Sequence, residues 1–93
     1  MSDKQAMLPQ VIVYSRAGCH LCEVLIEELM PLLRDRATLE VRDVDSRPDW
    51  RDRFGLEVPV VALGDELLCR YTLDRDAVLR ALRQADVRRP AIP

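Results

Sequence analysis

The sequence has no long apolar run, no cluster of basic residues and only three cysteines among its 93 residues. A transmembrane helix needs about 20 consecutive apolar residues, and a nucleic-acid-binding protein typically carries a basic patch. Residues 1–10 also lack the continuous apolar segment of a signal peptide. We therefore expect a cytoplasmic protein, in a compartment that keeps thiols reduced, with neither nucleic acid nor a membrane as its partner.

The composition is typical of a folded chain rather than a disordered one. Hydrophobic residues make up 48% of the sequence, charged residues 32%, and the formal net charge is −2. A chain of this length suits one small domain with a modest core. We expect a single domain over residues 1–93, a core at about 11–85, a frayed tail over 87–93 and a monomer in solution.

A Cys-x-x-Cys motif stands at residues 19–22, where a strand pattern over 11–14 gives way to a helix pattern. Cys19 therefore lies near the amino end of the expected helix, where unpaired N–H groups and the helix dipole favour a thiolate. The two intervening residues bring the sulfurs close enough to form a disulfide and to reopen it by exchange. In a reducing compartment this pattern predicts a redox-active pair.

A structural disulfide or a zinc site would use the same cysteines differently. A structural disulfide would leave Cys69 unpaired and is typical of secreted proteins. A zinc site needs four ligands, and only Cys69 and His20 remain beside the motif. The residues therefore favour redox chemistry over both.

Cys69 and His20 each have two interpretations. Cys69 either packs as a small apolar side chain in its strand or, if it lies near the motif, serves as a third redox thiol. His20 either favours the thiolate and exchanges protons beside Cys19, or is a solvated loop residue.

Alternation and helical periodicity predict the element order β-α-β-α-β-β-α. The expected strands are 11–14, 39–45, 56–62 and 67–71, and the expected helices follow Cys19, Ser46 and Thr72. The first two strands, joined by a helix, should be parallel, and the last two should form an antiparallel hairpin. The predicted fold class is α/β, with a four-stranded mixed sheet flanked by helices.

Local patterns predict how the helices pack. The buried face of the first helix should carry the leucines Leu21, Leu25, Leu29 and Leu32. Pro31 should kink or end this helix. Ser46 should cap the second helix, which places Trp50 and Phe54 in the core. Pro59 falls inside the third expected strand, and a central strand does not tolerate proline without a reason.

The element order, the motif after the first strand and the Val58-Pro59 pair at the third strand resemble the thioredoxin fold, and the short length resembles glutaredoxin. Residues 15–19, Ser-Arg-Ala-Gly-Cys, are similar to the glutaredoxin stretch that has a basic residue three places before the first cysteine. The Cys-His-Leu-Cys version is most similar to small bacterial glutaredoxin-like proteins. The resemblance covers residues 11–85.

The resemblance implies a role for each matching residue. Cys19 would be the exposed nucleophile, and Cys22 the more buried thiol that resolves the mixed disulfide. Pro59 would be cis, which places the Val58 backbone opposite the thiols to pair with a substrate peptide or glutathione. Arg16 would take the position of the basic residue that contacts glutathione.

The sequence departs from the glutaredoxin pattern at two places. His20 and Leu21 replace the usual proline and tyrosine between the cysteines. After the hairpin, where glutaredoxins have Gly-Gly and an acidic pair, residues 69–73 read Cys-Arg-Tyr-Thr-Leu, and Arg70 is either an exposed residue or a charge at the groove. The first departure bears on the pKa and the reduction potential of the thiols. The second bears on glutathione binding, because side chains replace glycines in the groove. Disulfide exchange is still expected.

We therefore predict a glutaredoxin-like thiol-disulfide oxidoreductase that acts through Cys19 and Cys22. Its predicted substrate or glutathione site comprises Arg16, His20, Val58, Pro59 and Arg70. Its substrate would be a protein disulfide or a glutathione mixed disulfide, and its reductant glutathione or a reductase. We expect no tightly bound cofactor or metal, with glutathione as a candidate co-substrate. Two alternatives stay open: an iron–sulfur or metal carrier that uses Cys19, and a redox-inert thioredoxin-fold binding module.

Overall fold

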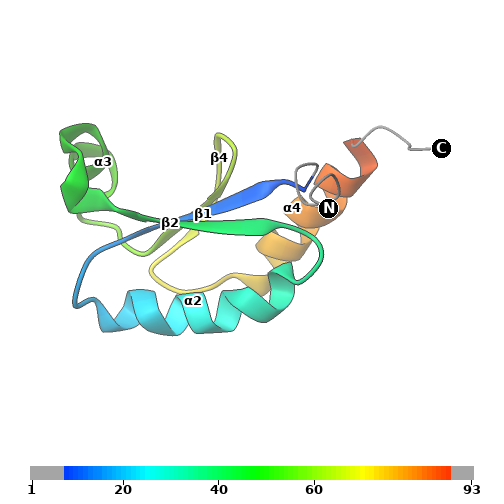
Figure 1. Ribbon diagram of the computed structural model, residues 1–93, viewed down its shortest axis with the longest axis horizontal. Helices are drawn as coiled ribbons and strands as arrows, with labels where there is room; N and C mark the ends of the chain where they lie inside the picture. Colours follow the sequence, from blue (N-terminus) through cyan, green and yellow to red (C-terminus); the bar gives the residue numbers. More distant parts are fainter. Residues whose placement is uncertain (1–7, 89–93) are drawn as a thin grey trace, which may run out of the picture.

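One mixed sheet forms the centre of the computed structural model, which describes residues 8–88 (Figure 1). The strands are β1 (Gln10–Ser15), β2 (Thr38–Asp43), β3 (Val60–Leu63) and β4 (Glu66–Arg70). The helices are α2 (His20–Leu33), α3 (Pro48–Phe54) and α4 (Arg75–Arg88), with a 3-10 turn, η1, at Val44–Ser46. The predicted element order β-α-β-α-β-β-α is confirmed.

Strand β1 lies inside the sheet, whose strand order is β2-β1-β3-β4. It pairs in parallel with β2 and antiparallel with β3, and β3 and β4 form the expected antiparallel hairpin. An interior strand is covered on both faces, which explains why residues 11–14 are apolar and buried without a break. The α/β class and the thioredoxin fold are therefore confirmed.

Helices α2 and α4 cover one face of the sheet, and α2 lies below the strands in Figure 1. The core on this face consists of Val11, Val13, Leu25, Leu29, Leu33, Val61, Val78 and Leu82. One prediction for α2 is wrong: Leu21 is 54% exposed, whereas Cys22 and Leu33 are buried. The buried stripe runs through Cys22 and Leu33 at helical spacing, so Leu21 falls outside it. The helix ends at Leu33, less than one turn after Pro31. This agrees with the prediction, because proline has no N–H to donate within the helix and its ring crowds the preceding turn.

The short helix α3 covers the opposite face, above the strands in Figure 1. Phe54 is buried and stacks on the ring of Tyr14, with 4.1 Å between the ring centroids. Trp50 is half-buried and meets the same ring edge-on at 5.8 Å. Trp50 and Phe54 thus pack into the core as predicted, and Tyr14 of β1 is the ring that each of them contacts. This packing attaches α3, and the loop that follows it, to the sheet.

The second strand is shorter than predicted. It ends at Asp43, whose carboxylate accepts a hydrogen bond from the N–H of Asp45 at 2.9 Å, and this local bond favours the 3-10 turn η1 over a continued strand. Ser46 is therefore not the cap of α3. Its hydroxyl donates to the Asp43 carbonyl at 2.6 Å, and Arg47 occupies the N-cap position.

The third strand begins later than predicted, at Val60, so Pro59 precedes the strand and does not interrupt it. A proline has no N–H to donate to a neighbouring strand, which explains why the ladder starts at the next residue. The expected strand over 56–62 is therefore a loop over its first half.

Helix α4 is longer than predicted. The Asp74 carboxylate accepts a hydrogen bond from the N–H of Ala77 at 3.0 Å, as a capping residue does. The helix continues to Arg88, so residues 87 and 88 of the predicted tail are helical. The rest of the predicted tail, residues 89–93, lies outside the described residues.

Candidate active site

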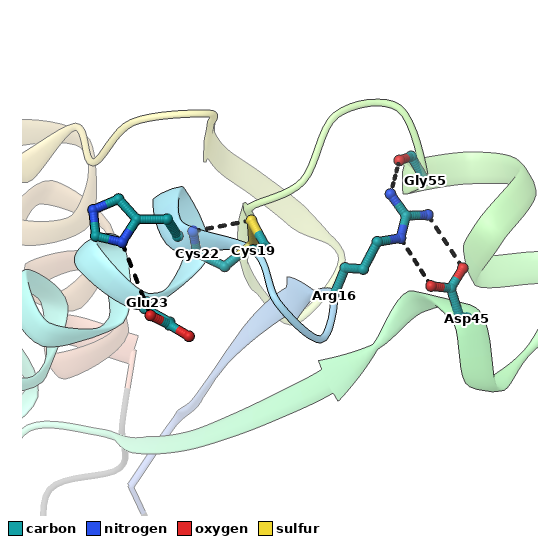
Figure 2. The surroundings of a disulfide bond; sticks show 7 residues. Arg16, Cys19, Cys22, Glu23, Asp45 and Gly55 are labelled. Carbon is teal, nitrogen blue, oxygen red and sulfur yellow. Dashed lines mark hydrogen bonds and ion pairs between the residues drawn. A yellow bond between two sulfur atoms is a disulfide. The ribbon is translucent and has the colours of Figure 1, made fainter.

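The first turn of α2 holds both cysteines of the motif. Gly18 has a φ of +76°, a left-handed conformation that glycine adopts readily, and it turns the chain from β1 into the helix. Cys19 is the N-cap residue, and its sulfur accepts a hydrogen bond from the N–H of Cys22 at 3.1 Å (Figure 2). The predicted position of Cys19 at the amino end of the helix is thus confirmed. In the reduced protein the same N–H would stabilise a thiolate on Cys19.

Cys19 and Cys22 form a disulfide, with 5.3 Å between their Cα atoms. The two residues differ in access to solvent: Cys22 is 1% exposed, whereas Cys19 is partly exposed. An incoming sulfur atom therefore reaches Cys19 more readily than Cys22.

Three loops meet at the end of the sheet that carries the motif. Strand β1 ends at Ser15, just before the motif loop. Its neighbour Tyr14 pairs with Val60 at the start of β3, and Val60 pairs with Arg70 at the end of β4. The loop before β3 and the segment after β4 therefore reach the same sheet end as the cysteines.

The Val58-Pro59 peptide bond is cis, as the resemblance implied. Pro59 is buried, and its carbonyl accepts a hydrogen bond from the N–H of Tyr71 at 2.8 Å. Val58 is half-buried and lies outside β3. The binding of a substrate by Val58 and Pro59 remains a prediction, and their position at the motif end of the sheet suits it.

Arg16 points away from the thiols. Figure 2 shows its side chain extending from the motif loop toward Asp45 and Gly55. The guanidinium donates to both carboxylate oxygens of Asp45, at 2.8 and 3.2 Å, and to the carbonyl of Gly55 at 2.9 Å. Arg16 thereby ties the motif loop to η1 and to the end of α3. Its predicted contact with glutathione remains a prediction, and it would require the guanidinium to change partners.

The ion pair of Arg16 and Asp45 should make stability depend on pH. The hydrogen bond from Arg16 holds the pKa of the Asp45 carboxyl below its usual value, against the opposing effect of burial. Such a carboxylate stabilises the fold above its unfolded pKa of about 3.9, and the contribution is lost as the pH falls through the lower folded value. We expect Asp45→Asn to weaken the loss of stability below about pH 4, measured from denaturant midpoints at a series of pH values.

Substitution of Arg16, the other member of the ion pair, provides the check on this prediction. Arg16→Gln should weaken the same acid dependence, because it removes the largest of the interactions that lower the pKa of Asp45, while that of Arg51 remains. An unchanged acid dependence in both variants would show that the ion pair does not contribute.

Arg70 and His20 lie at the edges of the site. Arg70 is exposed and forms an ion pair with Glu57, with 3.4 Å between Nη1 and Oε2. The His20 side chain is 84% exposed, and its Nδ1 lies 4.0 Å from Oε1 of Glu23. This exposure favours the solvated interpretation of His20. The substrate-binding roles of both residues remain predictions.

Cys69 is a free thiol, half-buried in β4 opposite Val61. It packs against the core that α2 and α4 form with the sheet. Burial raises the pKa of its thiol, and a hydrogen bond with the backbone of Asp74 acts in the opposite direction. These properties favour the packing interpretation over a third redox thiol, because the thiolate is the reactive form.

Three residues that shape the site were not identified from the sequence: Asp45, Leu56 and Tyr71. Asp45 binds Arg16, which lies 29 positions away in the chain, and no local sequence pattern predicts that pairing. Tyr71 has a φ of +69°, a left-handed conformation that is uncommon for residues other than glycine, and its residue type gave no signal for it. Leu56 is 95% exposed, although its sequence pattern predicted a strand.

The fold and the motif together define a thioredoxin-like protein whose Cys-x-x-Cys pair closes a disulfide at the start of a helix. The family model described as the glutaredoxin-like domain (DUF836) matches residues 10–83, and the chain belongs to this family. The resemblance drawn from the sequence is therefore confirmed.

Residues 8–88 carry neither a membrane-spanning helix nor a cluster of metal ligands. No helix in this part of the chain has the length and apolar character needed to cross a membrane. Within the same residues, no group of three or more His, Cys, Asp or Glu side chains is arranged to hold a metal ion.

Proposed function

We propose that this protein is a thiol-disulfide oxidoreductase with Cys19 as the nucleophile and Cys22 as the resolving thiol. The observation that carries the proposal is the asymmetry of the pair: Cys19 is partly exposed and its sulfur accepts a hydrogen bond from the N–H of Cys22, while Cys22 is buried. Membership of the glutaredoxin-like family supports the same chemistry.

The reaction begins when the Cys19 thiolate attacks one sulfur of a substrate disulfide. A mixed disulfide forms, and the other substrate sulfur leaves as a thiolate that takes up a proton. Cys22 then loses its proton and attacks the sulfur of Cys19, which releases the second substrate thiol. The substrate has gained two electrons and two protons, and the protein is left with the Cys19–Cys22 disulfide seen in the structure.

A second partner must return two electrons to the disulfide. We propose glutathione or a protein reductase for this step, in the reducing cytoplasm. The substrate would be a protein disulfide or a glutathione mixed disulfide lying against Val58 and Pro59, with His20 and Arg70 at the edges of the site. Because thiols carry the electrons throughout, the cycle requires no tightly bound cofactor.

An equilibrium redox titration of the protein against glutathione buffers tests the proposal. We expect one two-electron transition, which thiol labelling and mass spectrometry would monitor. In a separate assay, the protein should catalyse the reduction of bis(hydroxyethyl) disulfide. Cys69→Ser should leave the transition unchanged, because Cys69 stands outside the disulfide. The proposal would be overturned if neither glutathione nor dithiothreitol supported any disulfide reduction above the uncatalysed rate.

A further inference from the structure

Three large apolar side chains are exposed on segments that reach the motif end of the sheet. Leu21 is 54% exposed between the two cysteines, Leu56 is 95% exposed in the loop before Pro59, and Tyr71 is 47% exposed just after β4. We call Leu21, Leu56 and Tyr71 the apolar rim. Single exposed apolar residues are common on protein surfaces, but these three come from three separate segments that reach the sheet end next to the motif.

Hydrogen bonds connect the segments of the apolar rim. The hydroxyl of Tyr71 donates to the carbonyl of Leu56 at 3.4 Å, and its N–H donates to the carbonyl of Pro59. The residue before Leu56, Gly55, accepts a hydrogen bond from Arg16 of the motif loop. The relative positions of the loop before β3, the segment after β4 and the motif loop are therefore held before any partner binds, which lowers the entropic cost of binding.

The charges next to the apolar rim are already paired. Asp45 forms ion pairs with both Arg16 and Arg51, and Glu57 forms an ion pair with Arg70. Glutathione carries two carboxylates, and to bind either arginine it would have to displace a carboxylate of the protein itself. An uncharged apolar segment requires no such exchange and can cover Leu56, which now faces water almost completely.

We propose that the apolar rim binds an extended, uncharged apolar segment next to the cysteine of a protein disulfide. The substrate class is then a protein disulfide in an apolar context and not a glutathione mixed disulfide. This inference rests on the proposed function, because the bound segment delivers its disulfide to Cys19 for the exchange described above.

Two model substrates test the inference. Each is a short peptide whose single cysteine forms a mixed disulfide with 2-mercaptoethanol, flanked in one case by leucine and valine and in the other by serine and glycine. With dithiothreitol as the reductant, kcat/KM of the unmodified protein should be higher for the apolar peptide by about tenfold. Leu56→Ser and Leu21→Ser should each bring this ratio toward one.

Met30→Ser is the matched control. Met30 is 56% exposed on the same helix as Leu21, about two and a half turns further along α2, where it lies away from the motif. The ratio for this variant should equal that of the unmodified protein. Three results would overturn the inference. The first is an equal kcat/KM for the two peptides, and the second is an equal drop in the ratio in Met30→Ser and Leu56→Ser. The third is faster turnover of a glutathione mixed disulfide than of the apolar peptide.

Reduction of bis(hydroxyethyl) disulfide by the unmodified protein separates this inference from the proposed function. If the small disulfide is reduced but the two peptides are not distinguished, only the docking inference fails. If the small disulfide is not reduced at all, the proposed function fails and the inference fails with it.

Discussion

Replacement of Cys19 by serine is expected to lower the rate of disulfide exchange to the uncatalysed level, a loss on the order of 10³-fold or more. A serine hydroxyl is not ionised near neutral pH and does not attack a disulfide, and the buried Cys22 is poorly placed to substitute for it. The measurement is the initial rate of bis(hydroxyethyl) disulfide reduction with dithiothreitol. A Cys19→Ser protein that kept the full rate would show that the mechanism is wrong.

Cys22→Ser should separate the two thiol roles. Because Cys19 can still attack but no internal thiol resolves the product, the mixed disulfide should accumulate and be visible by mass spectrometry of the intact protein. Cys69→Ser is the matched control and should accumulate no adduct beyond that of the unmodified protein. If Cys22→Ser accumulates none either, Cys22 is not the resolving thiol.

Replacement of Phe54 by alanine is expected to lower the free energy of unfolding by about 3–5 kcal/mol. Phe54 is 3% exposed and stacks on Tyr14, so its removal leaves a cavity between α3 and the sheet. A loss of this size is a large part of the 5–15 kcal/mol that is typical of a whole domain. The measurement is denaturant unfolding of the oxidised protein, followed by tryptophan fluorescence of Trp50.

Leu56→Ala is the matched control for this prediction. Leu56 lies two residues after Phe54 but is 95% exposed, so its truncation should change stability by no more than about 0.5 kcal/mol. If Phe54→Ala does not fold, Phe54→Leu retains most of the apolar volume and should show a smaller loss in the same direction. Equal effects of Phe54→Ala and Leu56→Ala would contradict the packing described here.

Both predictions concern the same end of the molecule. Phe54 anchors α3, and the chain continues from α3 through Gly55 into the loop that carries Pro59. Arg16 holds the motif loop to the same Gly55 carbonyl. The position of Cys19 relative to the loop before β3 therefore depends on core packing as well as on the motif itself.

Much of the fold was predictable because its determinants are local. Short sequence patterns predict the conformation of short segments. Examples are the apolar run over residues 11–14, the helical spacing of Leu25 and Leu29, and the turn between β3 and β4. Errors occurred where two local structures compete closely. At residues 44–46 a side-chain hydrogen bond from Asp43 favours a 3-10 turn, and Pro59 delays the start of β3.

The cysteine pair was predictable for the same reason, since two residues of spacing on a helical turn determine how close Cys19 and Cys22 lie. The surroundings of the pair were not. Arg16 was expected to meet glutathione, yet its guanidinium binds Asp45 and Gly55, which are 29 and 39 positions away along the chain. Leu21 was expected to be buried and is exposed.

By itself, the sequence determined the order of elements, the position of the thiols at a helix start and the family to which the chain belongs, because spacing and periodicity act over a few residues. Only the tertiary structure decided which partner holds Arg16, that Tyr71 takes a left-handed backbone and donates to the Pro59 carbonyl, and that Leu21, Leu56 and Tyr71 are exposed. These features depend on contacts between segments that are far apart in the chain. Such contacts form only when β1, β3 and β4 pair and bring the ends of those segments together.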